Sequence, residues 1–194
     1  MTDDSGGDEL DPRVERSRRV IGEAALAEMA EVGYGALTVE GIAKRAGVSK
    51  ATIYRQWSGK LEVIGAALDQ LKATIPRDEL LPPRDRVVAM LAWMADHFGA
   101  ADEPVAACFP AMVSAAQYDP AVREFHHRFA ADRRQVLVDT IVAGQQLGQI
   151  DAGLDPRLTA ELLVGPIFYR RLMTDTPFPA DQVDKLVDTV LGPP

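Results

Sequence analysis

Three Asp-Pro pairs constrain the fold of this chain more than any other feature of its sequence. They lie at residues 11–12, 119–120 and 155–156, each time where an apolar pattern with helical spacing begins. An aspartate at the N-cap accepts hydrogen bonds from the free amides of the first turn, and a proline in that turn removes an amide that the helix does not use. Strand signals are almost absent. The sequence therefore predicts an all-α fold.

Caps, glycines and prolines set the limits of the expected helices. We expect them at about residues 12–33, 38–46, 49–57, 58–74, 83–98, 104–117, 120–148, 156–173 and 179–191. Thr38, Ser49 and Ser58 are expected as N-caps, and Pro110 interrupts or kinks the helix in which it lies. The proline-rich segment 75–85 joins a small N-terminal domain of three or four helices to a larger antiparallel helical bundle.

Charge is unevenly distributed along the chain, whose formal net charge is −8. Residues 1–11 hold five acids and no base, residues 12–60 hold nine bases and five acids, and residues 61–194 hold 12 bases and 19 acids. A basic segment between acidic ones is a candidate site for an anionic partner. Residues 1–11 are expected to form a disordered acidic tail.

The cellular setting follows from what the sequence lacks. Cys108 is the single cysteine, so there is no internal disulfide, and no apolar run approaches the ~20 residues of a membrane span. The N-terminus has no apolar stretch of the kind that a secretory signal needs. We therefore expect a soluble cytoplasmic protein without a membrane partner.

Residues 38–57, TVEGIAKRAGVSKATIYRQW, have the spacing of a helix-turn-helix. A small residue is followed four positions later by a glycine and six beyond that by an aliphatic residue. Gly47 can adopt the left-handed backbone of a tight turn, and Val48 fills the joint between the helices. The residues expected to form the core of this motif are Ile42, Ala43, Gly47, Val48, Ile53 and Trp57.

The opposite face of the second helix of this motif has a different character. Lys50, Ala51, Tyr54 and Arg55 fall on one arc at about 100° per residue. Cations, a phenol and a methyl group suit phosphates, guanine edges and a thymine methyl group in the major groove. Lys60 opens the next helix, where we expect it to hold a phosphate. The basic, aromatic stretch 46–60 is therefore expected to contact double-stranded DNA.

The segment GYGALTVEGIAKRAGVSKATIYRQWSGKLEVIGAAL (33–68) closely resembles the DNA-binding domain of the tetracycline-repressor (TetR) family of transcriptional regulators. The resemblance implies that residues 12–74 form a DNA-binding domain whose third helix enters the major groove. Trp57 stands where the family more often has phenylalanine. The DNA contacts that the resemblance implies are Thr38, Ser49, Lys50, Ala51, Thr52, Tyr54, Arg55 and Lys60.

One recognition helix reads only a few base pairs, so helix-turn-helix proteins usually bind palindromic operators as two-fold dimers. The segment 157–173, RLTAELLVGPIFYRRLM, is apolar over so wide an arc that we expect it to be buried on more than one side. This helix and the long helix before it are expected to pack against their copies in a homodimer. The residues expected at the interface are Ile141, Leu158, Leu162, Gly165, Phe168 and Tyr169.

Residues 161–191 also resemble a C-terminal domain found in many TetR-like regulators. This implies that residues 75–194 dimerise and hold an apolar cavity for a small effector that changes DNA affinity. Candidate lining residues, each of which also suits an ordinary core, are Trp93, Met94, His97, Phe98, Phe109, Met112, Phe125 and Phe129.

No catalytic, cofactor or metal site is expected. Residues 58–60, Ser-Gly-Lys, lack the other residues of a phosphate-binding loop. His126 and His127 are adjacent and so point to different faces of a helix, which argues against a shared metal. The leading interpretation is a dimeric, effector-responsive regulator, most simply a repressor. Two alternatives stay open: a helical small-molecule-binding protein with a vestigial DNA-reading helix, and a non-specific architectural DNA binder.

Overall fold

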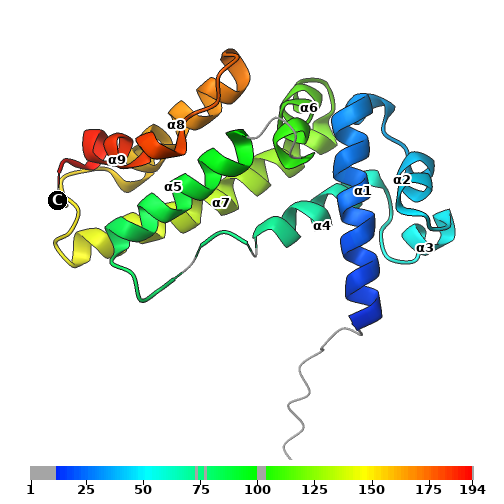
Figure 1. Cartoon of the computed structure of the whole chain (residues 1–194), viewed down its shortest axis with the longest axis horizontal. Helices are drawn as coiled ribbons and strands as arrows, with labels where there is room; N and C mark the ends of the chain where they lie inside the picture. The colour runs from blue at the N-terminus through cyan, green and yellow to red at the C-terminus, as the bar shows by residue number, and fades with distance from the viewer. Residues whose placement is uncertain (1–11, 73, 77, 100–103, 194) are drawn as a thin grey trace, which may run out of the picture. The chain divides into compact units, whose positions relative to one another are not determined.

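The computed structural model describes residues 12–72, 74–76, 78–99 and 104–193, and within those ranges the chain forms helices and turns without strands (Figure 1). It divides into two compact units, Met1–Ala73 and Thr74–Pro194. The predicted all-α fold is confirmed. The expected acidic tail at 1–11, with its Asp11 cap, lies outside the described residues. No helix in the described ranges is long and apolar enough to cross a membrane.

The first unit is built around α1 (Pro12–Ala36). This helix packs against α2 (Val39–Ala46) and α4 (Lys60–Lys72), while α3 (Lys50–Tyr54) packs against α2. Gly33 has φ 73° and ψ 164°, so the regular part of α1 ends where the sequence predicted, and one short turn follows. The fully buried side chains that hold the four helices together include Ile21, Ala25, Met29, Ile42, Ile53, Val63 and Ile64.

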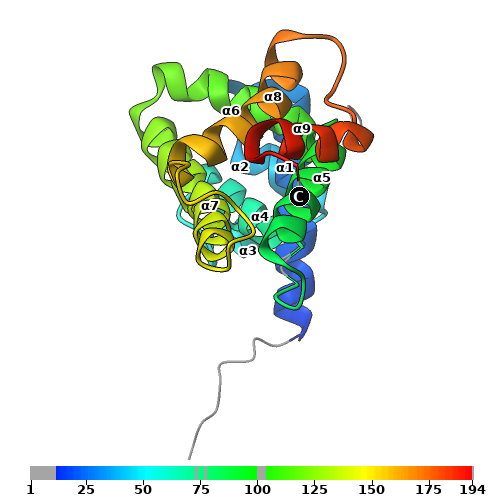
Figure 2. The ribbon, with the colours of Figure 1, turned by 90° about the vertical axis from the view of Figure 1, so that its left-hand side faces the viewer.

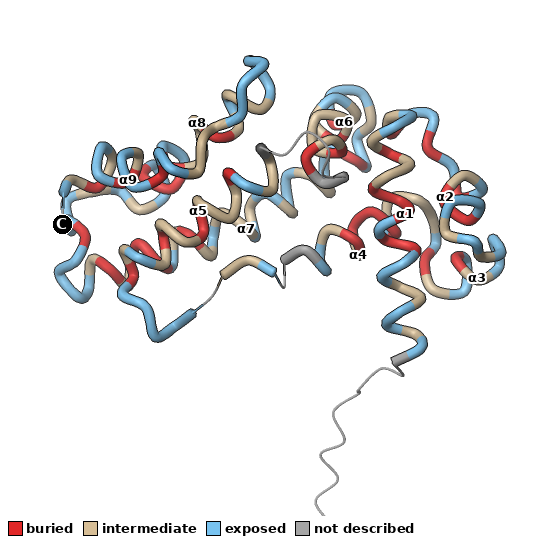
Figure 3. Tube along the Cα trace, viewed as in Figure 1, coloured by how far each residue is buried: buried red, intermediate tan, exposed pale blue. Residues whose placement is uncertain are grey.

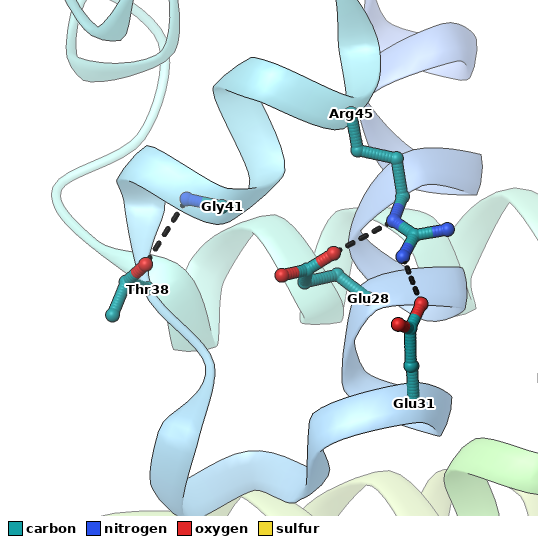
Figure 4. Close-up of polar contacts among 5 residues, drawn as sticks. All are labelled: Glu28, Glu31, Thr38, Gly41 and Arg45. Atoms are coloured by element: carbon teal, nitrogen blue, oxygen red, sulfur yellow. Dashed lines mark hydrogen bonds and ion pairs between the residues drawn. The ribbon is translucent and has the colours of Figure 1, made fainter.

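A cluster of charges ties α2 to α1 (Figure 4). Arg45, near the end of α2, donates from Nε to Glu28 Oε2 at 2.7 Å and from Nη2 to Glu31. The hydrogen bonds that Arg45 donates to these carboxylates raise its pKa above the usual value. The helices approach so closely that a Cβ at Gly41 would lie 2.6 Å from Glu28 Oε1. The ion pairs of Arg45 fix the position of α2, against which α3 packs.

Within its described residues, the second unit contains five α-helices and one short 3-10 helix. They are α5 (Pro83–Gly99), α6 (Pro104–Tyr118), α7 (Pro120–Gln146), α8 (Pro156–Met173), η1 (Ala180–Gln182) and α9 (Val183–Leu191). Helix α5 packs against α6, α7, α8 and α9, and α7 also contacts α6 and α8. Figure 1 shows α5 and α7 side by side, and Figure 2 shows the same bundle from its end. In Figure 3 buried residues recur along α5, α8 and α9, between mostly intermediate residues in α5 and between many exposed ones in α8 and α9.

Two of the three Asp-Pro caps lie within the described residues, and both are confirmed. Asp119 accepts from the Ala121 amide at 2.9 Å, at the start of α7. Asp155 accepts from the Leu158 amide at 2.7 Å, at the start of α8. The prolines that follow occupy the first turn of each helix.

The prediction that Ser58 caps α4 was wrong. Its hydroxyl donates to Glu62 Oε1 at 2.6 Å instead of accepting from a backbone amide. The first bond of the helix runs from the Val63 amide to the Gly59 carbonyl at 3.2 Å, so Gly59 holds the N-cap position. The helix begins one residue later than the sequence pattern suggested, so Ser58 lies just before the N-cap and bonds to the carboxylate of Glu62 instead.

Helix α6 continues through Pro110 without interruption. Because proline has no amide hydrogen, the carbonyl of Ala106, four residues earlier, loses its partner within the helix. Ala106 is 0% exposed, so water does not replace that partner. Arg171 of α8 donates to this oxygen from Nε and Nη2, at 3.0 and 2.5 Å. Pro110 thus creates an attachment point that holds α8 against α6.

Candidate nucleic-acid interface

The turn between α2 and α3 has helix-turn-helix geometry. Gly47 ends α2 with φ 68° and ψ 29°, in the left-handed region that glycine adopts without steric cost. Its amide donates to the carbonyls of Ala43 and Lys44. The Val48 amide donates to the Ala43 carbonyl at 3.0 Å, which closes the end of α2. The backbone therefore bends at Gly47, as the sequence predicted.

Most of the residues expected in the core of the motif are buried. Their exposed fractions are 0% for Ile42, 4% for Ala43, 0% for Ile53 and 8% for Trp57, while Val48 is half-buried and Gly47 lies exposed on the turn. Arg18 of α1 donates from Nε to Gln56 at 2.9 Å, and its guanidinium lies 6.0 Å from the centroid of the Trp57 ring. Helix α3 is thus anchored at both of its ends.

The opposite face of α3 is open to solvent. Lys50, Ala51, Tyr54 and Arg55 are all exposed, and 55% of Tyr54 is accessible although it is aromatic. Ile53, which lies off this arc, is buried. Two cations, a phenol and a methyl group therefore project together from a supported helix, in the arrangement that the sequence predicted.

A carboxylate of α2 lies within this surface. Lys50 Nζ is 2.5 Å from Glu40 Oε1, and the two side chains are 54% and 62% exposed. The hydrogen bond from Lys50 lowers the pKa of Glu40, and the same bond raises the pKa of Lys50, so both groups stay charged. Reasoning from the sequence missed Glu40. The available signal was that Glu40 is the one acid between residues 38 and 60.

Of the three hydroxyl groups predicted to contact DNA, two cap helices and the third bonds to one of these two. Thr38 Oγ1 accepts from the Gly41 amide at 3.0 Å, and Ser49 Oγ accepts from the Thr52 amide at 3.1 Å. The hydroxyls of Ser49 and Thr52 also lie 3.0 Å apart. A hydroxyl that accepts from an amide keeps its own hydrogen for another acceptor, such as a phosphate oxygen. The contacts of these residues with DNA stay predictions.

Lys60 has a structural task that the sequence did not reveal. Its ammonium donates to the carbonyls of Tyr34 and Leu37 at 2.8 and 2.9 Å, and it lies 4.4 Å from the centroid of the Tyr34 ring. Two of its three donors therefore hold the segment that leads from α1 into α2. The contact of Lys60 with a phosphate stays a prediction.

Two family models match the chain over most of its length. The model described as bacterial regulatory proteins, tetR family, matches residues 21–67, and the model described as tetracyclin repressor-like, C-terminal domain, matches residues 65–190. The chain belongs to the TetR family. The first match contains the whole helix-turn-helix, and the second spans most of the larger bundle.

Relatives of this TetR-family protein agree with that assignment. The HTH-type transcriptional regulator YdeS of Bacillus subtilis (strain 168) is 33% identical over 165 residues, 84% of this chain and 82% of YdeS. The DNA-binding transcriptional repressor TetR of Mycobacteroides abscessus is 28% identical over 168 residues, 86% of this chain and 87% of that protein. The structure of FadR from Bacillus subtilis in complex with stearoyl-CoA matches with a TM-score of 0.66 at 23% identity, covering 90% of this chain and 98% of FadR.

The family assignment and the geometry of α3 lead to one conclusion. The chain is a DNA-binding regulator of transcription of the helix-turn-helix type. The family and the names of its relatives point to regulation and not to catalysis.

Helix α8 of this TetR-family regulator carries an exposed apolar stripe. Leu158, Leu162, Tyr169 and Met173 are 56%, 53%, 62% and 71% exposed, at helical spacing along one side. Large apolar side chains in such a row are typical of a surface that another molecule covers. The opposite side of α8 faces inward, since Leu163 is 0% exposed. The wide apolar arc seen in the sequence of α8 therefore has two parts: residues that belong to the internal core and residues that form an exposed stripe.

Two of the predicted interface residues lie elsewhere. Ile141 of α7 is 0% exposed within the core of its own unit, and its place at an interface stays a prediction. Phe168 is half-buried and stacks on Phe109 with ring centroids 4.8 Å apart, and its place in an interface stays a prediction. Gly165 is half-buried on α8 between Leu162 and Tyr169.

The residues predicted to line an effector cavity fall into separate groups. Phe98 and Phe109 form a cluster with Phe168, and the Phe109 ring centroid also lies 6.3 Å from that of His126. Met112 is 4% exposed, and Met94 packs against the main core of the bundle. The other four form pairs along single helices: Trp93 with His97 at 4.1 Å on α5, and Phe125 with Phe129 at 5.8 Å on α7.

His126 belongs to the aromatic cluster although the sequence did not single it out as a lining residue. Burial lowers the pKa of His126 below 6.5, and the neighbouring His127 lowers it further. The cluster therefore combines three apolar rings with one imidazole whose neutral form is favoured by burial, a polar group that could orient a mostly apolar ligand.

Proposed function

We propose that this TetR-family regulator is a homodimeric repressor that acts in the cytoplasm and binds a palindromic operator through α3 of each protomer. The main observation behind the proposal is that α3 exposes a polar face to solvent, while Ile53 on its other side is buried. Arg55 suits the O6 and N7 atoms of guanine, and Ala51 suits the methyl group of thymine. Lys50 and Tyr54 add donors for guanine or phosphate.

Phosphate contacts at the edges of this surface fix the orientation of α3 in the groove. Thr38, Ser49 and Thr52 supply hydroxyl donors there, and the remaining donor of Lys60 supplies a cation. Because such contacts do not depend on sequence, they contribute to binding of any duplex. Specificity is then expected to come from Arg55 and its neighbours on the exposed arc.

The apolar stripe of α8 supports the homodimer. A second copy of the same stripe can cover Leu158, Leu162 and Tyr169 through a two-fold contact, in which identical surfaces meet. Such a dimer presents two copies of α3 to half-sites that lie one helical turn of DNA, ~34 Å, or a multiple of it, apart.

The aromatic cluster of the second unit supports an apolar effector. FadR from Bacillus subtilis, which has a similar fold, forms a complex with stearoyl-CoA. In the present chain Phe98, Phe109 and Phe168 supply apolar surface and His126 supplies one polar contact. We propose that a small, largely apolar ligand binds beside these rings and weakens DNA binding. Titration of the protein–DNA complex with stearoyl-CoA as a probe should release DNA, and Phe109→Ala should raise the concentration required.

DNA recognition is tested by fluorescence anisotropy on two duplexes of equal length. One comes from the region upstream of the protein's own gene, and the other has a scrambled sequence. A regulator should prefer the upstream duplex by a factor on the order of 10³ or more, and the logarithm of its affinity should fall by about 0.9 per phosphate contact for each tenfold rise in salt. Equal affinities with the same salt dependence would indicate an architectural binder. Salt-independent or absent binding would indicate a vestigial reading helix.

The dimer interface is tested by sedimentation velocity on variants of the 21.1 kDa chain. Leu162→Glu places a charge in the stripe and should convert the dimer into a monomer. Leu80→Glu makes the same change at a residue that is 94% exposed outside the helices, and it should leave the dimer intact. A Leu162→Glu protein that still sediments as a dimer would show that α8 is not the interface.

A further inference from the structure

The ion pair between Glu40 and Lys50 lies on the surface that the proposed function assigns to DNA. Five bases and one acid occur in residues 38–60, and the bases are Lys44, Arg45, Lys50, Arg55 and Lys60. Arg45 is already bound to two carboxylates of α1, and Lys60 is bound to two backbone carbonyls. Lys50 therefore represents a large share of the charge that this surface can offer to phosphate, and Glu40 neutralises it.

A phosphate cannot bind Lys50 without affecting Glu40. The Nζ atom of Lys50 lies 2.5 Å from Glu40 Oε1, so a phosphate oxygen in hydrogen-bonding contact with Nζ would come within a few ångström of the carboxylate. Two anions at that distance repel each other. Both side chains are more than half exposed, at 54% and 62%, so the pair can open toward solvent. DNA binding and the Glu40–Lys50 pair are therefore in competition.

We propose that Glu40 limits the affinity of this regulator for DNA by holding Lys50 in an internal ion pair that DNA must displace. The inference rests on the proposed role of α3 and adds a residue that sets how tightly the protein binds. When Lys50 moves to a phosphate, it releases about one condensed cation from the DNA. The freed carboxylate of Glu40 then lies beside the phosphates and keeps about one condensed cation in place, so the net release is about one ion smaller than the number of contacts implies.

The variant Glu40→Gln tests this ion count. It removes the carboxylate and keeps a side chain of similar size, and its salt dependence should be steeper than that of the wild type by about 0.9 in the logarithmic slope. The affinity of the variant relative to the wild type should therefore grow about eightfold for each tenfold reduction in salt. Glu79→Gln makes the same change of net charge in the other unit, at an exposed residue, and should leave the slope unchanged.

A second comparison distinguishes the ion pair between Glu40 and Lys50 from direct repulsion between Glu40 and phosphate. In a Lys50→Ala background Glu40 has no lysine to hold, so Glu40→Gln should no longer steepen the salt dependence. An equal gain in that background would overturn the proposal, because Glu40 would then act by repelling phosphate directly. An unchanged or shallower slope in the single variant would overturn it as well. The preference of the wild type for the upstream duplex tests the proposed function by itself, independently of these variants.

Discussion

Replacing Arg171 with methionine tests whether α8 is attached to α6 through the carbonyl that Pro110 leaves free. Methionine keeps much of the length and volume of arginine but has no hydrogen-bond donor. In Arg171→Met the carbonyl oxygen of Ala106 loses the two N–H donors of Arg171, whose nitrogens lie 3.0 and 2.5 Å away. Ala106 is 0% exposed, so water cannot replace them. A buried polar atom without a partner costs about 1–3 kcal/mol. We expect the second unit to lose stability by that amount.

The assay can report on the second unit alone. The chain has two tryptophans, Trp57 in the first unit and Trp93 in the second. In a Trp57→Phe background, tryptophan fluorescence during thermal or urea unfolding follows Trp93 only. Every variant is compared within that background, so the cost of the Trp57 substitution cancels. The expected lowering of the thermal midpoint is about 2–4 °C per kcal/mol for a chain of this size.

Pro110→Ala provides the matched control. Alanine restores an amide at position 110, four residues after Ala106, and this amide can donate to the Ala106 carbonyl within the helix. Arg171→Met should therefore cost less in the Pro110→Ala background than in the parent, by about 1 kcal/mol or more. An equal cost in the two backgrounds would show that Arg171 acts through packing or charge and not through the free carbonyl. No cost in the parent would refute the attachment altogether.

Three further predictions concern stability and are checked by thermal and urea unfolding. Lys60→Met should destabilise the first unit by about 1–3 kcal/mol, because two carbonyl oxygens lose their donor; an unchanged stability would contradict the structural role of Lys60. Gly47→Ala should cost about 1–2 kcal/mol, because it forces a Cβ into the left-handed region, whereas Gly35→Ala should be nearly neutral since its Cβ meets open space. The lowered pKa of His126 means that the fold favours neutral imidazole, so its stabilisation is complete above about pH 6.5 and is lost as the pH falls through the folded-state pKa. His126→Gln should therefore lose less stability than the wild type between about pH 7 and pH 5, and parallel pH profiles would contradict this assignment.

Most of the fold could be predicted because its signals are local. Asp119 and Asp155 cap their helices through bonds to amides two or three residues away, and Gly47 makes a turn that few other residues permit. Spacing alone also separated the buried Ile53 from the exposed arc of α3. Each of these features depends on the backbone geometry of a few neighbouring residues, which the sequence specifies directly.

The partners of long charged side chains could not be predicted in the same way. Lys50 and Lys60 have flexible stems, and each binds a group that lies 10 or more residues away in sequence. Such contacts depend on how helices pack. The need for a donor such as Arg171 could have been predicted more easily. Pro110 inside a helix leaves the carbonyl of Ala106 without an amide partner, so another donor has to satisfy it.

The proposed dimer interface shows a different limit of prediction from sequence. When the apolar arc of a helix is wider than one core requires, the helix is expected to make two apolar contacts. The pattern does not show which residue belongs to which contact. Leu162 and Leu163 are adjacent and look alike in the sequence, yet one is 53% exposed and the other is 0% exposed.

The central claim is that α3 reads base pairs, and the most direct measurement is the affinity of Arg55→Ala for a set of operators in which each base pair is changed in turn. If Arg55 reads a base, the variant should bind the intact operator about 1–3 kcal/mol more weakly and lose discrimination at one base pair of each half-site, while the rest of the sequence preference is kept. A uniform loss at every position would show that Arg55 contacts the phosphate backbone only. Full retention of both affinity and preference would show that the exposed face of α3 does not meet the duplex.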